Sequence, residues 1–227
     1  MAPRALLWPA VLLVVCVAAP VCAVELIANG NFEYDSDWEI PATEYPAAYT
    51  TAAAHMGNRS MRVGIVEPAH NRYSYSSARQ LVTIPADAAS TTLRFWLYPT
   101  SGESTANLIV PTHPLASTIT RAALSGDRQY VLVLDEYDQW IDTLVWQRTD
   151  DRQWMSYEFD LAGYAGHTIK LQFGAYNDGL SGVTGLYVDD VSLEICGSVT
   201  PTWLNRGQSG IDVPKAYWVG PHRLLRK

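Results

Sequence analysis

Short runs in which apolar and polar residues alternate are the feature that most constrains the fold of this 227-residue chain. Successive side chains of a β-strand point to opposite faces, so such runs predict strands with one buried face. Leu93, Phe95 and Leu97, for example, share the apolar face of one run. Comparable runs lie at residues 60–65, 80–84, 93–98, 130–134, 143–147, 155–161, 169–175 and 186–193.

Turn residues separate these runs, and no long helical periodicity accompanies them. Pro85 ends the run at 80–84, because proline cannot donate to a sheet ladder. An acidic segment at 135–138 lies between two runs and indicates a hairpin. The sequence therefore predicts an all-β protein of eight or more strands, in which successive strands pair antiparallel to form the two packed sheets of a β-sandwich.

The first 23 residues are typical of a secretory signal peptide. Arg4 supplies the positive charge, Leu6–Ala19 the apolar stretch and Val21–Ala23 the small-residue cleavage site. We expect a mature chain that begins near Val24 and a secreted, extracellular protein. The alternative is an uncleaved membrane anchor. Because two prolines break the apolar stretch and it is short for a spanning helix, we expect no membrane insertion after signal removal.

Residues 24–195 are expected to form one domain, and residues 196–227 a basic tail or linker. The body carries 10 Lys and Arg against 22 Asp and Glu, a net charge of −12, whereas the tail carries a net charge of +4. A body with this negative charge repels the phosphate backbone of nucleic acids, and we therefore expect no nucleic-acid partner. The tail loses the alternation but keeps three large aromatic residues, so part of it could dock on the domain or on a partner: Trp203, Tyr217 and Trp218.

Two of the three cysteines lie within the predicted signal peptide. Cys196 would then be the only cysteine of the mature protein, and no internal disulfide could form. The apolar core, a metal ion or both would have to stabilise the domain. Cys196 itself could be a buried inert residue, a free thiol or one half of an intermolecular disulfide.

Several segments resemble a known group of domains in their order and spacing. They are Asn29–Glu33 with Trp38, Gly57–Gly64, Gln80–Ala86, Leu93–Trp96, Trp154, Phe159–Leu161, Tyr164–Gly166, Leu171–Phe173, Asn177–Gly179 and Val188–Leu193. Together they resemble the galactose-binding-like or carbohydrate-binding jelly-roll domains of secreted bacterial glycosidases and peptidases, with similarity to meprin-type adhesion domains. The resemblance spans about residues 26–194 and implies jelly-roll topology, but it does not settle function.

The resemblance also implies a structural calcium ion between the entering and the closing strand. The ligands would be the carboxylates of Glu33 and Asp190 and the backbone carbonyls near Asn29 and Asn31, since calcium selects oxygen donors. Asp189 points to the other face of its strand and is the weaker candidate. Alternatively, these carboxylates are solvated or accept hydrogen bonds from turn amides. Segment 177–179 could donate to a second cation, although a turn is the simpler interpretation.

The chain is rich in tryptophan and tyrosine, with eight Trp and 13 Tyr against four Phe. Their rings combine a flat apolar face with a polar edge, which suits stacking against a pyranose. If two strand faces coincide, they form a sugar platform of Arg94, Trp96, Tyr98, Gln172 and Tyr176. Alternatively, Trp96 fills the core. A second possible site at the sandwich edge consists of aromatic residues assigned to loops: Trp38, Tyr45, Tyr49, Tyr73, Tyr75 and Trp140.

Catalytic motifs give little support for an enzyme. The sequence contains no His-Glu-x-x-His pattern and no nucleophile elbow, and a solvated hairpin tip explains the carboxylates of segment 135–138 with Asp142. We therefore expect a secreted, non-catalytic module that binds a polysaccharide or a cell-surface glycan. One alternative is an adhesion domain with a protein partner and no sugar affinity. The other is a glycosidase or polysaccharide lyase.

Overall fold

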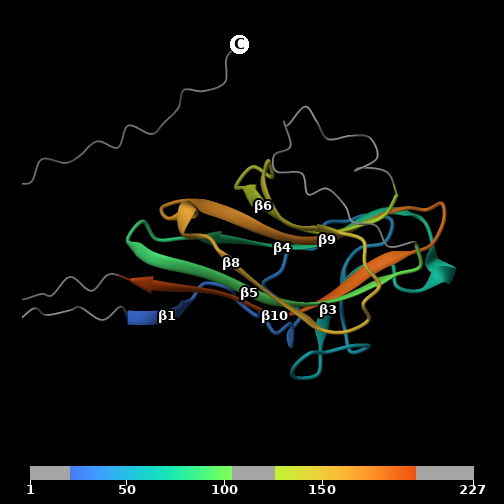
Figure 1. Ribbon diagram of the computed structural model, residues 1–227, viewed down its shortest axis with the longest axis horizontal. Coiled ribbons are helices and arrows are strands. Elements are labelled where there is room, and N and C mark those ends of the chain that lie inside the picture. Colours follow the sequence, from blue (N-terminus) through green and yellow to red (C-terminus); the bar gives the residue numbers. More distant parts are fainter. Residues whose placement is uncertain (1–20, 104–125, 198–227) are drawn as a thin grey trace, which may run out of the picture. The chain divides into compact units, whose positions relative to one another are not determined.

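The computed structural model describes residues 21–103 and 126–197 (Figure 1). This part of the chain consists almost entirely of β-strands. The strands are β1 (Val21–Glu25), β2 (Ala48–Thr50), β3 (Ser60–Gly64), β4 (Tyr73–Thr83), β5 (Ala88–Ser101), β6 (Arg128–Asp135), β7 (Trp140–Gln147), β8 (Met155–Asp160), β9 (Thr168–Asp178) and β10 (Thr184–Gly197). Two 3-10 turns, Pro68–His70 and Ala162–Tyr164, accompany them.

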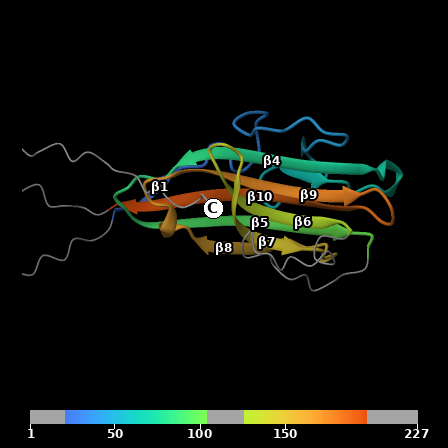
Figure 2. The same cartoon turned by 90° about the horizontal axis from the view of Figure 1, so that it is seen from above.

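The strands form two antiparallel sheets that pack face to face (Figure 1). Sheet A has the order β2-β3-β10-β5-β8, with β1 also paired to β10, and sheet B has the order β4-β9-β6-β7. From β3 to β10 the chain changes sheet at every connection except the β6–β7 hairpin. This is the jelly-roll arrangement, so the predicted all-β, two-sheet antiparallel β-sandwich with jelly-roll topology is confirmed. Figure 2 shows that strands of both sheets run in about the same direction.

The prediction that successive strands pair is largely wrong. Only β2 with β3 and β6 with β7 are neighbours both in sequence and in a sheet. Every other pair joins strands that are separated along the chain, with β10 lying between β3 and β5. Alternation in a sequence shows which side of a strand is buried but carries no information about which strand lies beside it.

The core lies between the two sheets, and the predicted alternation places its residues correctly. Leu93, Phe95 and Leu97 point inward from β5, and Leu171 and Phe173 point inward from β9; all are at most 1% exposed. The rings of Phe95 and Phe173 meet edge to face at 5.0 Å and connect the sheets. Met155 was also expected inward but is 37% exposed, because β8 is the edge strand of sheet A.

The entering segment and the closing strand lie against each other, as predicted from the ends of the domain. Leu26 N–H donates to the Leu193 carbonyl at 3.0 Å, and Val191 N–H donates to the Gly30 carbonyl at 2.9 Å. At Gly30 the two backbones are so close that a Cβ atom would lie 1.8 Å from the Val191 oxygen. Glycine is therefore required here for close approach.

Two differences from the sequence analysis concern the ends of the described domain. β1 begins at Val21, inside the predicted signal peptide, and β10 continues to Gly197, beyond the predicted boundary at 195. Cys196 is disulfide-bonded, so the interpretations that left it without a bond within the chain are wrong. They rested on assigning both other cysteines to the signal peptide, whereas Cys22 lies opposite Cys196 in the β1–β10 pair. Residues 1–20 and most of the predicted tail, 198–227, lie outside the described residues.

Within residues 21–103 and 126–197, no helix is long and apolar enough to cross a membrane.

Replacing Gly30 with alanine is expected to lower the free energy of unfolding by about 3 kcal/mol or more. The new Cβ would push the entering segment off β10 and break the hydrogen bond from Val191. Gly163→Ala is the matched control, because a Cβ at Gly163 meets nothing within 4 Å and should change stability by less than about 0.5 kcal/mol. Urea unfolding of the three proteins measures the difference. Equal midpoints for all three would show that the contact at Gly30 is dispensable.

Candidate functional site

The structure divides the five predicted sugar-binding residues between the two outer faces of the sandwich. Arg94, Trp96 and Tyr98 point outward from β5 in sheet A, and Gln172 and Tyr176 point outward from β9 in sheet B. Because the sheets pack face to face, these outer surfaces look in opposite directions (Figure 1). The five residues therefore do not form one platform. The sequence identified residues that share a face of one strand, but not the sheet to which each strand belongs.

Trp96 lies on the outer face of sheet A and not in the core, which removes that alternative. Its ring is half-buried because His55 stacks on it, with ring centroids 3.8 Å apart and an interplanar angle of 17°. Trp154 meets both His55 and Tyr98 edge-on, with centroids 5.6 Å apart in each case. Trp96 is thus part of an aromatic cluster, and His55 already covers one face of its ring.

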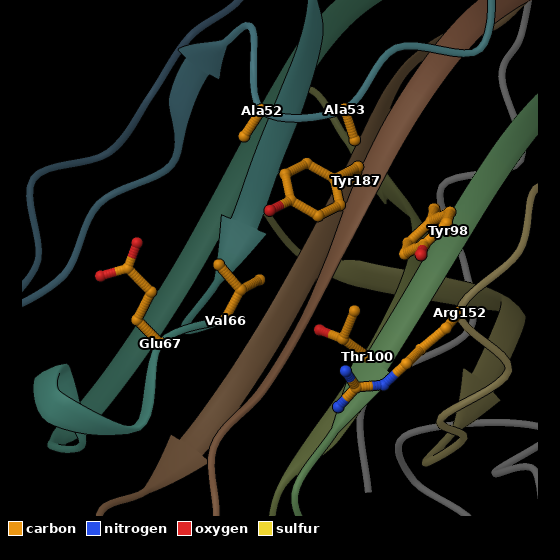
Figure 3. Close-up of a pocket in the computed structure, with 8 residues that line it drawn as sticks. All are labelled: Ala52, Ala53, Val66, Glu67, Tyr98, Thr100, Arg152 and Tyr187. Carbon is orange, nitrogen blue, oxygen red and sulfur yellow. The ribbon is translucent and has the colours of Figure 1, made fainter.

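A cavity of about 300 Å³ lies beside this cluster, on the outer face of sheet A. β3, β10 and β5 pass beneath it, and Tyr98 and Tyr187 project from β5 and β10 (Figure 3). Glu67 and Arg152 lie on opposite sides of it (Figure 3). We call it the Tyr98 pocket, and it is lined by Ala52, Ala53, Val66, Glu67, Tyr98, Thr100, Arg152 and Tyr187.

A smaller hollow of about 230 Å³ lies between β5 and β8 on the same face. Arg94 and Trp96 line it, but the guanidinium of Arg94 is already bound on two sides. Its Nε lies 2.9 Å from a Glu158 carboxylate oxygen, and its Nη1 lies 3.0 Å from a Glu194 carboxylate oxygen. A ligand would have to compete with two carboxylates for Arg94, so this hollow is the weaker site.

Sheet B carries a second aromatic surface on its outer face. Tyr73 and Tyr75 on β4 and Tyr176 on β9 form a compact group whose ring centroids lie 4.7 to 5.7 Å apart. Tyr73 is 56% exposed and Tyr75 is 54% exposed, although both rings are large and partly apolar. Burial and the hydrogen bond with Tyr73 raise the pKa of Tyr75 to about 12, so its hydroxyl stays protonated at neutral pH.

This surface continues across the sheet onto β6 and β7. Tyr130 packs against Trp146 with centroids 6.1 Å apart, and Trp146 stacks on Trp140 at 5.9 Å. Tyr130 lies over Gly174, where a Cβ would approach its ring to 2.3 Å. Tyr176 packs against the same cluster. We call the whole surface the tyrosine face: Tyr73, Tyr75, Tyr130, Trp140, Trp146 and Tyr176.

Three of these residues, Tyr73, Tyr75 and Trp140, were expected in loops at the sandwich edge, and this prediction is wrong. Tyr73 and Tyr75 belong to β4 and Trp140 to β7. The strand at Tyr73 was missed because the inward positions between the tyrosines are Ser74 and Ser76, both buried, so the alternation has no apolar side. The signal that could have identified this strand is the spacing of two residues between Tyr73 and Tyr75, which places both rings on the same face of a strand.

Charged residues beside the tyrosine face balance one another. Arg79 lies 2.9 Å from Glu39 and 3.2 Å from Asp138, and Lys170 pairs with the same two carboxylates. The hydrogen bond from Lys170 lowers the pKa of Asp138. Gln172, a neutral amide, points outward from the same strand as Lys170. This edge of the face therefore offers donors and acceptors without a net charge.

The predicted calcium ligands have partners within the protein. Glu33 Oε1 accepts hydrogen bonds from the backbone amides of Asn58 and Arg59 at 2.7 and 3.0 Å, and the amides lower the pKa of Glu33. Asp190, at a bulge with φ of 48°, lies 2.6 Å from His55 Nδ1. The Asn29 carbonyl accepts from Phe32 N–H and Trp38 Nε1, while Asn31 is exposed. Glu33 therefore matches the alternative given in the sequence analysis, in which the carboxylate accepts hydrogen bonds from turn amides.

Asp189 has a larger structural role than the sequence indicated. It is fully buried and accepts hydrogen bonds from the backbone amides of His55 and Asp190 at 2.7 and 2.8 Å. Burial raises its pKa to about 6. Asp189, Asp190 and Glu33 together hold residues 51–59, the loop that contributes Ala52 and Ala53 to the Tyr98 pocket.

A different acidic group is close enough to surround a cation. It includes Asp178, from the segment 177–179 that the sequence offered as a possible donor to a second cation, whereas Glu103 and Asp127 were not identified. The carboxylate oxygens of Glu103, Asp127 and Asp178 lie within 4.8 Å of one another. Arg148 Nη1 lies 2.7 Å from Glu103, and Asn177 Nδ2 donates to Asp127 at 2.7 Å. Arginine already neutralises part of this group, so its charge does not require a metal. Asn177 and Asp178 still belong to β9, and the bend begins only at Gly179, with φ of 76°, so the turn predicted for segment 177–179 starts later than expected.

The acidic hairpin tip offers no paired carboxylates for hydrolysis in this structure. Asp135 Oδ1 accepts from the backbone amides of Tyr137 and Gln139, both at 2.8 Å, which closes the predicted hairpin. Asp138 pairs with Lys170 and Arg79. These carboxylates thus hold the β6–β7 turn and the edge of the tyrosine face.

Comparisons with known proteins give distant likenesses. No protein-family model matches the chain. The pre-pro-metalloprotease PrtV of Vibrio cholerae serotype O1 is 29% identical over 150 residues, 61% of this chain, which spans only 15% of that protein. A family 61 carbohydrate-binding module in complex with β-1,4-galactotriose aligns with 75% of this chain and 98% of its own, with a TM-score of 0.49 and 16% identity. The CBM22-1 xylan-binding domain from Paenibacillus barcinonensis Xyn10C covers 81% of this chain and 100% of its own, with a TM-score of 0.45 and 11% identity.

Asp189 makes the stability of the domain depend on pH. Its folded-state pKa of about 6 lies above the ordinary 3.8, so its contribution is complete below the ordinary value and is lost as pH rises through about 6. Between pH 4 and 7 the wild type should lose roughly 2 kcal/mol of unfolding free energy relative to Asp189→Asn. Urea unfolding at several pH values, with chelator present, measures this difference. Asp87→Asn, at an exposed position on the β4–β5 turn, should follow the wild type; an Asp189→Asn curve parallel to the wild type contradicts the assignment.

Proposed function

We propose that this protein is a secreted, non-catalytic module that binds a neutral polysaccharide or glycan on the tyrosine face. The observation that carries the proposal is the pair of exposed rings, Tyr73 and Tyr75, contiguous with Tyr176 on the outer face of sheet B. Monomeric domains rarely leave contiguous large apolar surface in water unless it binds something. The rings belong to rigid strands, so the surface exists before a ligand arrives.

The chemistry of the tyrosine face suits sugars. A pyranose stacks its C–H groups on an aromatic ring, and its hydroxyls need donors and acceptors nearby. The phenol hydroxyls of Tyr75 and Tyr176 are protonated at neutral pH and can donate, and burial raises the pKa of both further. The ion pairs of Arg79 and Lys170 with Glu39 and Asp138 supply donors and acceptors of both signs. A neutral glycan is favoured over a charged one, because these pairs leave no excess charge to attract it.

The second candidate is a protein-interaction or adhesion surface without sugar affinity. Tyrosine and tryptophan are also enriched in the centres of protein interfaces, so exposed rings alone fit both functions. The row of rings across β4, β9, β6 and β7 favours a glycan. Its rings span neighbouring strands with centroids 4.7 to 6.1 Å apart, so several sugar units of one chain could contact it at once.

Replacing Tyr75 with alanine is expected to weaken binding to a neutral polysaccharide by about tenfold or more, because one stacking contact is worth roughly 1 to 2 kcal/mol. Tyr137→Ala is the matched control: Tyr137 is 75% exposed at the β6–β7 turn and is not one of the stacked rings of the tyrosine face. Affinity electrophoresis against galactan, xylan, cellulose derivatives and an acidic pectin measures binding, with thermal melts to check folding. Equal retardation of wild type and Tyr75→Ala excludes the tyrosine face, and no retardation by any glycan favours the adhesion function.

We also propose that calcium stabilises the entering segment against β10 and does not contact the glycan. Two observations support it: the backbones of the two segments touch at Gly30 and Val191, and the Glu33 carboxylate is kept ionised beside them. Glu33, Asp190 and carbonyls near Asn29 and Asn31 would hold the ion, which would supply positive charge between the carboxylates.

If calcium binds there, a chelator should lower the melting temperature, since an ion at a hundred times its dissociation constant stabilises the fold by about 2.7 kcal/mol. Glu33→Gln and Asp190→Asn should each remove most of that response. Asp127→Asn tests the alternative acidic group of Glu103, Asp127 and Asp178. Loss of the response only in Asp127→Asn would move the ion to that group, and an identical melting curve with chelator and with millimolar calcium would reject the proposal.

A further inference from the structure

We propose that the Tyr98 pocket is a second carbohydrate site, which takes one or two neutral sugar residues on the face opposite the tyrosine face. The inference rests on the proposed function in that it assumes the same class of ligand. It adds a separate place of binding, in sheet A, and a different mode: a short stretch of glycan seated in an open pocket instead of contacts spread along the tyrosine face.

The size and walls of the pocket define what it can hold. Its volume of about 300 Å³ lies at the lower end of small-molecule sites, which fits one or two sugar residues and not a long chain. The rings of Tyr98 and Tyr187 meet at 72° with centroids 5.9 Å apart, so they form an aromatic corner. A pyranose placed in this corner would lay its C–H face on one ring and its edge against the other.

The charges of the pocket favour a neutral polyol. Glu67 and Arg152 stand on opposite sides of the cavity, with side chains 68% and 63% exposed (Figure 3). An anionic ligand would be attracted by Arg152 but repelled by Glu67. A cationic ligand would be attracted by Glu67 but repelled by Arg152. Sugar hydroxyls both donate and accept, so they can bond to both groups. The hydroxyl of Tyr187 is protonated at neutral pH, as for any tyrosine, and is a further donor.

Both walls of the pocket are fixed by contacts within the protein. Arg152 has φ of 48°, an unfavourable conformation for its residue type, held by a hydrogen bond from its N–H to the Pro99 carbonyl at 3.1 Å and by Nε to Asp150 at 2.9 Å. On the other wall, Ser60 Oγ donates to the Ala53 carbonyl at 2.6 Å, and the loop is held further on by Asp189. A ligand would thus order few protein groups on binding, which preserves affinity at a small site.

Two sites on opposite faces would allow one molecule to bind two glycan chains. The tyrosine face belongs to sheet B and the Tyr98 pocket to sheet A, so a chain bound at one cannot obstruct the other (Figure 1). The protein would then cross-link polysaccharide, which a single-site module cannot do.

Titration calorimetry with neutral trisaccharides, namely β-1,4-galactotriose, xylotriose and cellotriose, tests the proposal. The wild type should bind two molecules of at least one of them. Ala53→Trp, which fills the pocket, should reduce the stoichiometry to one. Tyr75→Ala should weaken the other site by about tenfold or more, so at protein concentrations close to the wild-type dissociation constant only the pocket site remains detectable. Turbidity of a galactan or xylan solution should rise with the wild type and not with either variant.

Glu67→Ala provides a variant that should fold like the wild type, because the Glu67 carboxylate is largely exposed. It should weaken the pocket site by about tenfold, the loss of one hydrogen bond to a charged group. Asp87→Ala, another exposed acid on the β4–β5 turn, is the matched control and should bind like the wild type. Thermal melts of all variants verify folding.

The outcomes separate this inference from the proposed function. A stoichiometry of one that is lost in Tyr75→Ala and unchanged in Ala53→Trp and Glu67→Ala overturns the pocket and leaves the tyrosine face in place. A stoichiometry of one that is lost only in Ala53→Trp and Glu67→Ala supports the pocket and overturns the tyrosine face. No binding of any trisaccharide and no retardation by any polysaccharide overturns both.

Discussion

The contact between the backbone of Gly30 and that of Val191 is the constraint on which much of the remaining structure depends. It fixes the entering segment against β10, the strand that also pairs with β1, β3 and β5. Phe32, two residues later, is then fully buried and packs against Trp38, with ring centroids 4.9 Å apart. Trp38 in turn meets Phe173 of sheet B at 5.9 Å. One position without a side chain thus lets the entering segment reach the core between the sheets.

The contact between Gly30 and Val191 also affects the Tyr98 pocket on sheet A. With the entering segment in place, Glu33 reaches the amides of Asn58 and Arg59, while Asp189 holds the amide of His55. Carboxylates from both ends of the domain therefore hold the loop of residues 51–59, which forms one wall of the Tyr98 pocket. Burying Asp189 is unfavourable, as its raised pKa shows, and two backbone donors offset part of that cost.

How much the sequence could predict follows from what alternation encodes. It identified the inward residues of β5 and β9 and placed Trp96 on the opposite side of its strand from Phe95, because both depend only on the geometry of a single strand. It left open whether Trp96 fills the core. It could not place Trp96 and Tyr176 on opposite faces, since that depends on which strands pair across the fold. It offered Asp178, within segment 177–179, as a possible cation donor but could not join it to Glu103 and Asp127 for the same reason: residues so far apart in the chain meet only through sheet pairing.

β1 and β10 bring both ends of the described domain to one point, with Val21 directly opposite Gly197. A tension applied through these two ends would separate the antiparallel pair from its end and break the hydrogen bonds between β1 and β10 one after another. It would not load all of these hydrogen bonds at the same time. Such a geometry resists force poorly, yet Cys196, one residue from the loaded end, is disulfide-bonded. A covalent bond thus anchors β10 one residue from the end at which this separation would begin.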